Sequence, residues 1–181
     1  MTAADARGLI AHPSLGRGAP QVWADLGCGR GTFTLALAEL LPGGSTIHAV
    51  DADRGALAAL PHKSHGVVIV PHAGDFTVDA WPRRGLAGVL MANALHYVED
   101  QDAFLATLVA SMAEPRLLLV EYDTDKSSPW VPFPLSRQTA SRRLADAGFE
   151  SVIELGERAS VFRRAAIYAI LAYSVDVTRS C

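Results

Sequence analysis

The chain predicts an α/β fold in which one mostly parallel sheet is doubly wound, with helices on both faces. Apolar strands alternate with segments of helical spacing along nearly the whole sequence, an order typical of this class. The early strands are continuous apolar runs, as expected where both faces of a parallel sheet are covered. A length of 181 residues suits a single domain with a sizeable core.

The expected elements follow one another with short connections. The last helix, 136–148, has Ser136 as a plausible cap and Gly148 at its end. A Pro- and Ser-rich loop, 123–134, is expected over one end of the sheet. The expected strands are 20–26, 45–51, 66–72, 87–93, 115–122, 149–155 and 163–173, and the expected helices are 3–11, 32–41, 54–60, 102–113 and 136–148. The single domain, 1–181, would comprise an N-terminal segment 1–19, a core 20–173 and a tail 174–181.

Composition and charge exclude several classes of protein. A net charge of −3 without a block of Lys and Arg argues against nucleic-acid binding. The longest apolar stretch, 165–173, is far shorter than the ~20 residues of a membrane helix, so no membrane association is expected. Two cysteines, Cys28 and Cys181, make no disulfide framework, and no secretory signal begins the chain. A cytoplasmic location is therefore expected, and no metal site.

A glycine-rich loop follows the first strand, with Gly27, Gly29 and Gly31 in the segment DLGCGRG. Ligands of such sheets bind beyond the carboxyl ends of the strands, and glycine lets a ligand approach bare backbone. Asp51 ends the next strand, where a carboxylate can accept hydrogen bonds from a ribose diol. The loop and the acid together indicate an adenosine ligand. A tight turn and a helix-capping role for Asp51 or Asp53 remain the alternatives.

The glycine loop differs from the loops that bind dinucleotides and nucleoside phosphates, which narrows the kind of adenosine ligand. A dinucleotide loop requires glycine where this chain has Thr32, and the Gly-Lys-Ser/Thr of a phosphate-binding loop is absent. The strand before the loop ends in Asp25, whose negative charge is unfavourable beside a pyrophosphate and favourable beside a cation. A nicotinamide-dependent oxidoreductase is therefore the weaker alternative.

Four segments resemble motifs of the class I S-adenosylmethionine-dependent methyltransferases, of the small-molecule branch. In order along the chain they are VWADLGCGRGTFT, IHAVDAD, HAGDFTV and GVLMANALHYVED. The resemblance covers about residues 20–173. It implies a Rossmann-like sheet of seven strands with an antiparallel last strand, and S-adenosylmethionine as the methyl donor.

The resemblance also implies how the glycine loop is used. Gly27, Gly29 and Gly31 would shape the pocket for the amino-acid end of the donor. Asp25 would order the loop or face the ammonium group. Cys28 lies in the same loop as a space-filling residue, with no partner nearby in the sequence that would make it a nucleophile.

The remaining binding residues implied by the resemblance follow later strands. Asp51 would hold the ribose, and Ala52 and Asp53 would flank the adenine. Asp75 would accept a hydrogen bond from the adenine amino group, and Phe76 would donate its backbone N–H. Asn93 and Ala94 would lie near the methionine portion through their backbone oxygens.

His96 is the best candidate for a catalytic base, because it follows the strand toward which the methyl group should point. The alternative is that His96 only caps a helix or packs under the loop. His72, Glu121, Tyr122 and Asp123 are weaker choices at other strand ends.

The acceptor is expected to be a small molecule, because the motifs of nucleic-acid methyltransferases are missing. Trp130 and Phe133 of the loop offer apolar area for it. The alternative is that this Pro-rich loop packs on its own core. The protein is expected to be a monomer or a homodimer. Because the N-terminal segment is short, a partner could close the site, and a non-catalytic binder of the donor is the alternative function.

Overall fold

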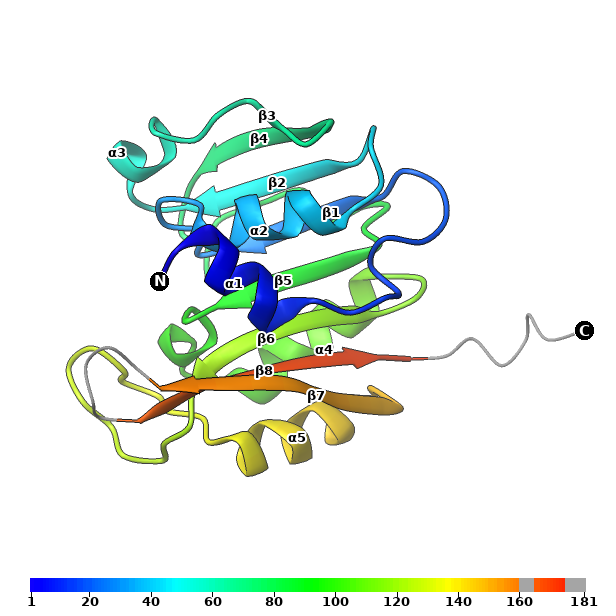
Figure 1. The fold of residues 1–181 in the computed structure, drawn as a ribbon. Coiled ribbons are helices and arrows are strands. Elements are labelled where there is room, and N and C mark those ends of the chain that lie inside the picture. The colour runs from blue at the N-terminus through cyan, green and yellow to red at the C-terminus, as the bar shows by residue number, and fades with distance from the viewer. Residues whose placement is uncertain (160–164, 175–181) are drawn as a thin grey trace, which may run out of the picture.

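The computed structural model describes residues 1–159 and 165–174, which form one mixed sheet (Figure 1). The strands are β1 (Val22–Leu26), β2 (Thr46–Asp51), β3 (Lys63–Ser64), β4 (Val67–Ala73), β5 (Gly88–Ala92), β6 (Arg116–Tyr122), β7 (Ser151–Ala159) and β8 (Ala166–Tyr173). Their order in the sheet is β3-β4-β2-β1-β5-β6-β8-β7. The pairs from β4 to β6 are parallel, whereas β8 is antiparallel to β6 and β7. The predicted doubly wound, mostly parallel sheet with an antiparallel last strand is confirmed.

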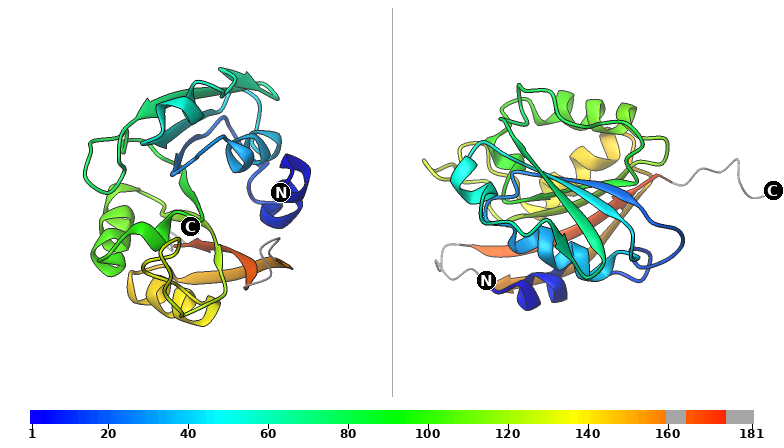
Figure 2. Two further views of the ribbon diagram at one scale, coloured as in Figure 1. Left: turned by 90° about the vertical axis from the view of Figure 1, so that its left-hand side faces the viewer. Right: turned by 90° about the horizontal axis from the view of Figure 1, so that it is seen from above.

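Helices cover both faces of this sheet (Figure 2). One face carries α1 and α2, and the other carries α4 and α5. The helices are α1 (Ala3–Ile10), α2 (Thr32–Leu40), α3 (Arg54–Leu57), α4 (Gln101–Ser111) and α5 (Arg137–Asp146), with a short 3-10 turn η1 (Leu95–Tyr97). Parallel strands connected in this way bring the carboxyl ends of β1, β2, β4, β5 and β6 to one edge of the sheet.

The apolar runs of the strands are explained by two hydrophobic clusters, one on each face. Leu90 and Met91 are neighbours in β5 and both fully buried, yet they belong to different clusters. Leu90 packs in the cluster that contains residues of α1 and α2, and Met91 in the cluster with residues of α4 and α5. A strand buried on both sides has no solvent-facing positions, which is why its sequence does not alternate.

Side-chain caps define where several helices begin. The Asp53 carboxylate accepts from the backbone N–H groups of Gly55 and Ala56 at the start of α3. Ser136 caps α5 by accepting from the N–H of Thr139, as predicted. Such caps satisfy backbone donors that the helix itself leaves unpaired. Of the two acids considered for the cap before Arg54, Asp53 is therefore the one that takes this role.

The sheet has eight strands rather than the expected seven. The additional strand, β3, pairs antiparallel with β4. The turn between them contains His65 at φ 48° and Gly66 at φ 81°. Two successive residues with positive φ are the geometry of a tight hairpin turn, in which a strand of two residues forms without a longer apolar pattern.

Other segments differ from the expected elements, or lie partly outside the residues that the structure describes. Helix α3 ends at Leu57 instead of 60. No helix forms in 74–87, a segment that Pro82 interrupts. Residues 163–164 of the expected last strand and 175–181 of the expected tail, with Cys181, lie outside the described residues. In the part of the chain that is described, no helix has the length and apolar character needed to cross a membrane.

Candidate functional site

The glycine loop connects β1 to α2 and is held by the neighbouring strand β2. The backbone N–H groups of Gly27 and Cys28 both donate to the carbonyl of Val50, at 2.9 and 3.1 Å. Gly27 has φ 74°, and a Cβ there would lie 2.7 Å from the Cβ of Ala94. Gly31 has φ 81°, and a Cβ there would lie 2.1 Å from Leu60 Cδ2. Glycine is required at both positions for backbone conformation and for close packing.

Asp51 ties the loop to the end of β2. Its Oδ2 accepts from the N–H of Gly29 at 2.7 Å, and its Oδ1 accepts from the N–H of Asp53 at 2.8 Å. A carboxylate offers about four acceptor positions on its two oxygens, so both oxygens retain capacity for a ligand. Asp51 therefore has the position and the unused acceptors expected of a residue that binds a diol.

Asp25 is fully buried at the end of β1. Its Oδ2 accepts from the hydroxyl of Thr34 at 2.6 Å, while its Oδ1 has no hydrogen-bond partner. Burial, with a further contribution from the charge of Asp51, raises the pKa of the Asp25 carboxyl to about 7. An unpaired buried carboxylate oxygen is costly, and a cationic group is the partner that would offset this cost.

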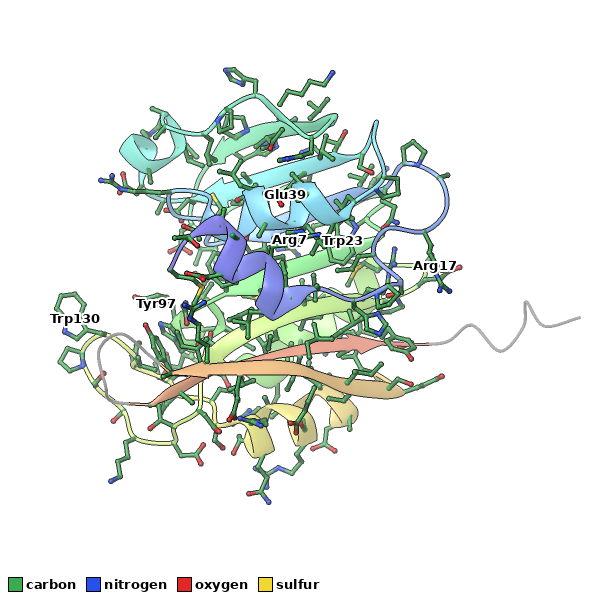
Figure 3. The ribbon with its side chains drawn as sticks, in the orientation of Figure 1. Arg7, Arg17, Trp23, Glu39, Tyr97 and Trp130 are labelled. Carbon is green, nitrogen blue, oxygen red and sulfur yellow. The ribbon has the colours of Figure 1, made fainter. Side chains whose placement is uncertain are left out.

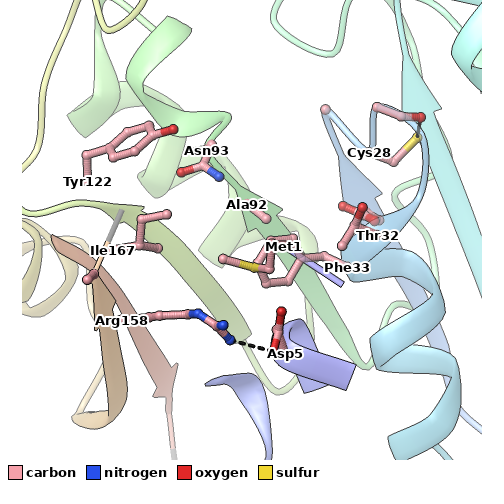
Figure 4. Close-up of a pocket in the computed structure, with 14 residues that line it drawn as sticks. Met1, Asp5, Cys28, Thr32, Phe33, Ala92, Asn93, Tyr122, Arg158 and Ile167 are labelled. Carbon is pink, nitrogen blue, oxygen red and sulfur yellow. Dashed lines mark hydrogen bonds and ion pairs between the residues drawn. The ribbon is translucent and has the colours of Figure 1, made fainter. Parts of the chain in front are cut away.

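A cavity of about 370 Å³, here named the glycine-loop cavity, opens beside this carboxylate (Figure 4). The N-terminal helix and the far strands complete it, because β7 and the start of β8 reach the same edge of the sheet as β1. Arg158 of β7 lines it and forms an ion pair of 2.7 Å with Asp5. The lining residues are Met1, Asp5, Asp25, Gly27, Cys28, Gly29, Thr32, Phe33, Ala92, Asn93, Tyr122, Arg158, Ala159 and Ile167.

Asn93 follows β5 in a strained conformation, with φ 53°. Its backbone N–H donates to the carbonyl of Val120 at 2.8 Å, but its buried side-chain Oδ1 has no partner. The sequence predicts a role for the backbone oxygen of Asn93, whereas the structure adds an unpaired oxygen on the side chain. Strain and an unsatisfied polar atom at one residue are features found at ligand-binding positions.

A second cavity of about 810 Å³, here named the His96 cavity, adjoins the first. Asn93 and Tyr122 line both cavities. Two of its aromatic residues are exposed to solvent, Tyr97 at 52% and Trp130 at 74%, and Figure 3 shows both at the same end of the sheet. The lining residues are Asn93, His96, Tyr97, Tyr122, Thr124, Lys126, Ser127, Ser128, Trp130, Val131 and Ala165.

His96 forms a buried pair with Glu121 at the base of this cavity. Its Nδ1 lies 2.7 Å from one carboxylate oxygen, and its backbone N–H donates to the other at 3.2 Å. Because an ionised carboxylate only accepts hydrogen bonds, Nδ1 carries the proton. The lone pair of the neutral ring is then on Nε2, and the pair has the arrangement of a base oriented by an acid.

The other residues predicted for the site take different positions. Phe76 is buried near Gly27, with its Cε1 3.3 Å from a Cβ built on that glycine. Asp75 accepts from the backbone and hydroxyl of Thr77 in the turn after β4. The residues that do not line the glycine-loop cavity are Gly31, Asp51, Ala52, Asp53, Asp75, Phe76 and Ala94. Asp51, Ala52, Asp53, Asp75 and Phe76 lie at or just after the ends of β2 and β4, on the side of the loop where the nucleoside part of a donor is expected, whereas Gly31 ends the loop and Ala94 follows β5.

Cys28 is buried within the loop, and its thiol contacts the carbonyl of Gly29 at 3.7 Å. Burial, with the charges of Asp25 and Asp51, raises the pKa of this thiol. A thiol that resists ionisation is a poor nucleophile, which agrees with the space-filling role expected of Cys28.

Sequence reasoning did not identify Arg158, and it ranked Glu121 only as an alternative base. Glu121 carries a detectable signal, since it is a charged residue inside the apolar strand RLLLVEY and is 1% exposed. A buried acid requires a partner, and that requirement points to a residue such as His96. Arg158 gives no comparable signal, because its place beside the glycine loop depends on the order of strands in the sheet.

Comparisons with known proteins bear on this site. The model of a family described as "Methyltransferase domain" matches residues 24–114, half of the chain. No curated protein matches the chain. Among solved structures, magnesium protoporphyrin IX methyltransferase (ChlM) from Synechocystis PCC 6803 with bound SAM is similar at TM-score 0.67 and 17% identity, over 95% of this chain and 77% of that one.

Two further structures share the fold. YcgJ from Bacillus subtilis has TM-score 0.69 and 12% identity, over 94% of this chain and 98% of that one. EvdMO1 has TM-score 0.64 and 18% identity; the match covers 95% of this chain but only 40% of that longer chain. The family match includes the glycine loop and the segment containing Asn93 and His96, and so the chain belongs to the methyltransferase domain family of enzymes.

Proposed function

We propose that this protein transfers a methyl group from S-adenosylmethionine to a small-molecule acceptor by in-line displacement. The observation that carries the proposal is that the glycine-loop cavity and the His96 cavity adjoin, with Asn93 and Tyr122 lining both. Methyl transfer needs a donor and an acceptor to meet in line, and positioning alone can supply about 7–11 kcal/mol of barrier lowering. Two adjoining cavities with different linings suit two different ligands.

The glycine-loop cavity suits the amino-acid end of the donor. The unpaired oxygens of Asp25 and Asn93 are acceptors for an ammonium group. Arg158, positioned by Asp5, supplies the cation that a carboxylate needs. Acceptors and a cation facing one small cavity form the complement of a zwitterion.

The other side of the loop is assigned to the nucleoside. Asp51 would accept from the ribose diol while it holds Gly29 and the backbone of Asp53. Ala52 and Asp53 are both exposed beside it, where adenine would lie. The turn that contains Asp75 and Phe76 is close to Asp51, because the N–H of Gly74 donates to the Asp51 carbonyl at 3.0 Å.

The chemistry divides between the donor and the protein. S-adenosylmethionine supplies a methyl group activated by its positively charged sulfur. His96 would accept the proton of an acceptor hydroxyl on Nε2, and Glu121 would hold the ring in the tautomer that can do so.

The relatives support a small acceptor. ChlM is named for a porphyrin substrate and was solved with the same donor bound, and another similar structure is named as an arsenic(III) methyltransferase from Chlamydomonas reinhardtii. The cytoplasmic location and the monomeric or homodimeric state stay predictions, as does a partner that closes the site.

Calorimetric titration with S-adenosylmethionine, S-adenosylhomocysteine and NADH tests the donor assignment. We expect micromolar binding of both sulfur compounds and no binding of NADH. Asp51→Asn should weaken both by about 10-fold or more, because a ribose hydrogen bond to a charged acceptor is worth ~1.5–3 kcal/mol. Asp100→Asn is the matched control and should bind normally, because Asp100 caps α4, lines neither cavity, and can be replaced there by asparagine, which also caps helices.

Two outcomes would contradict the proposal. NADH binding without the sulfur ligands would indicate an oxidoreductase. Binding of both sulfur ligands with no methyl transfer to any acceptor class would indicate the non-catalytic alternative. Equal affinity of the two aspartate variants would overturn only the ribose assignment.

A further inference from the structure

The walls of the His96 cavity differ from those of an ordinary surface hollow. Tyr97 and Trp130 approach it from separate segments, η1 and the loop 123–134, and both keep more than half of their surface exposed. Large exposed aromatic side chains grouped at one cavity are uncommon on a protein surface and mark binding positions. Flat rings stack on such side chains at centroid distances of 4.5–7 Å. The volume, about 810 Å³, accommodates a ligand of one or two fused rings.

The charge at the outer wall comes from Lys126. In the part of the chain that is described, its ammonium group makes no ion pair, although two aspartates are close in the sequence. Asp123 is paired with Arg137, and Asp125 accepts from the backbone of Ser136 and the hydroxyl of Thr139. Both acids are thus committed to α5, and Lys126 is left as a cation beside the cavity.

His96 contributes a basic nitrogen to the same cavity. His96 is 2% exposed, lines the cavity and is oriented by Glu121 through Nδ1, so Nε2 is the ring nitrogen that carries the basic lone pair. A base at this position is useful only if the acceptor must lose a proton, as a hydroxyl group does and a thiolate or a neutral amine does not. The lining of the cavity therefore combines a proton acceptor, aromatic side chains and a cation.

We propose that the acceptor is a flat hydroxy-aromatic carboxylic acid, bound with its ring against Tyr97 and Trp130, its carboxylate at Lys126 and its hydroxyl at His96. This inference rests on the proposed function. The hydroxyl gives its proton to Nε2 of His96, and its oxygen forms the new bond to the methyl carbon. The electron pair of the broken sulfur–methyl bond stays on the donor sulfur, which becomes neutral as His96 becomes cationic.

The first experiment measures the binding of three small probes to the protein in the absence of donor. Calorimetry and quenching of tryptophan fluorescence detect the binding. The probes are 6-hydroxy-2-naphthoate, 2-naphthol, which lacks the carboxylate, and 2-naphthoate, which lacks the hydroxyl. We expect the two acids to bind about 2- to 5-fold more tightly than the neutral naphthol, the range of a partly exposed ion pair. Lys126→Met should remove this preference and keep the affinity for 2-naphthol.

Lys63→Met is the matched control, because Lys63 lies in β3 at the far edge of the sheet and is the only other lysine of the chain. It should retain the preference for the acids. Trp130→Ala should weaken all three probes together, by about 5- to 100-fold, as expected for the loss of one stacking partner. Mass spectrometry with S-adenosylmethionine present should then detect 6-methoxy-2-naphthoate and no product from 2-naphthoate.

Equal binding of the acids and the neutral naphthol would overturn the inference, and so would a Lys126→Met variant that keeps the preference. Charge-selective binding without any methylated product, in a protein that does bind S-adenosylmethionine, would overturn the acceptor role. Failure of the proposed function is distinguishable, because it appears in the donor titration and leaves the donor-free binding of the acids unaffected.

Discussion

The two adjoining cavities are built in different ways. The glycine-loop cavity takes six of its fourteen lining residues from β1, the loop and α2, which are one continuous stretch of sequence. The His96 cavity is assembled from the end of β5, η1, the end of β6, the loop 123–134 and Ala165. The first is therefore a local structure that the rest of the fold completes, and the second exists only after the strands have been ordered.

The two cavities therefore differ in how freely their residues can be substituted. The loop has backbone conformations that only glycine adopts readily, at Gly27 and Gly31, and neighbours that leave no room for a side chain. Six of the eleven residues that line the His96 cavity lie in the loop 123–134, where side chains can change without disturbing the core. Such a division would permit a constant donor site beside an acceptor site that can change. Substitutions in each cavity test it.

The largest expected effect is on the His96 side. His96→Asn keeps an N–H donor near the position of Nδ1, so that Glu121 stays paired, but removes the basic nitrogen. We expect kcat for 6-hydroxy-2-naphthoate to fall by about 10²–10⁴-fold, the usual contribution of a general base. Steady-state kinetics measures this, and a donor titration should give unchanged affinity.

His65→Asn is the control for that substitution. His65 is exposed in the hairpin turn at φ 48°, a conformation that asparagine tolerates. It should leave kcat and donor binding unchanged. A His96→Asn variant with normal kcat would mean that the base is elsewhere, and one that loses donor affinity would mean that the two cavities are not separable.

The second effect is on the glycine-loop side and depends on pH. Asp25 has a folded pKa of about 7 against an ordinary value of 3.8. A cationic ammonium favours the ionised carboxylate, so affinity for S-adenosylhomocysteine should rise as pH increases toward about 7 and level off above it. Asp25→Asn should weaken this ligand by about 10- to 100-fold at pH 8, the loss of a charged hydrogen bond of ~1.5–3 kcal/mol, and make its affinity independent of pH.

The stability of the free protein gives an independent readout of the same group. Because the folded pKa is above the unfolded one, the folded state binds more protons between pH 4 and pH 7. The free energy of unfolding should therefore fall as pH rises through this window, by about 4 kcal/mol for a shift of this size. Chemical denaturation at a series of pH values measures this, and the plot of unfolding free energy against pH should be steeper for wild type than for Asp25→Asn. Parallel plots would show that Asp25 is already ionised below pH 7.

The smallest expected effect is at Asn93, which lines both cavities. Asn93→Gly relieves a positive φ of 53° while removing the unpaired Oδ1. Stability should be retained or rise by up to about 1 kcal/mol, since glycine adopts this conformation without strain. Affinity for S-adenosylhomocysteine should fall by about 3- to 10-fold, and affinity for 5′-deoxy-5′-methylthioadenosine, which lacks the amino-acid end, should not change. Equal weakening of both ligands would place Asn93 beside the nucleoside instead.

Much of the fold could be read from the sequence because its signals are local. The expected β6 strand, 115–122, differs from the observed Arg116–Tyr122 by one residue, and Ser136 caps α5 as predicted. The β3 hairpin was not anticipated, because two residues are too few to carry a periodic pattern and the turn depends on a non-glycine residue, His65, with positive φ. Local patterns identify long elements well and very short ones poorly.

The sequence by itself determined the doubly wound fold, the glycine loop and the acid at the end of β2, because apolar periodicity and glycine conformations act over a few residues. The tertiary structure alone decided that His96 meets Glu121, 25 residues away, and that Arg158 of β7 reaches the loop after β1. The contact between His96 and Glu121 requires β6 to lie beside β5. The position of Arg158 requires β8 to lie antiparallel between β6 and β7. Strand order is set by the packing of the whole sheet, and no short segment of this chain encodes it.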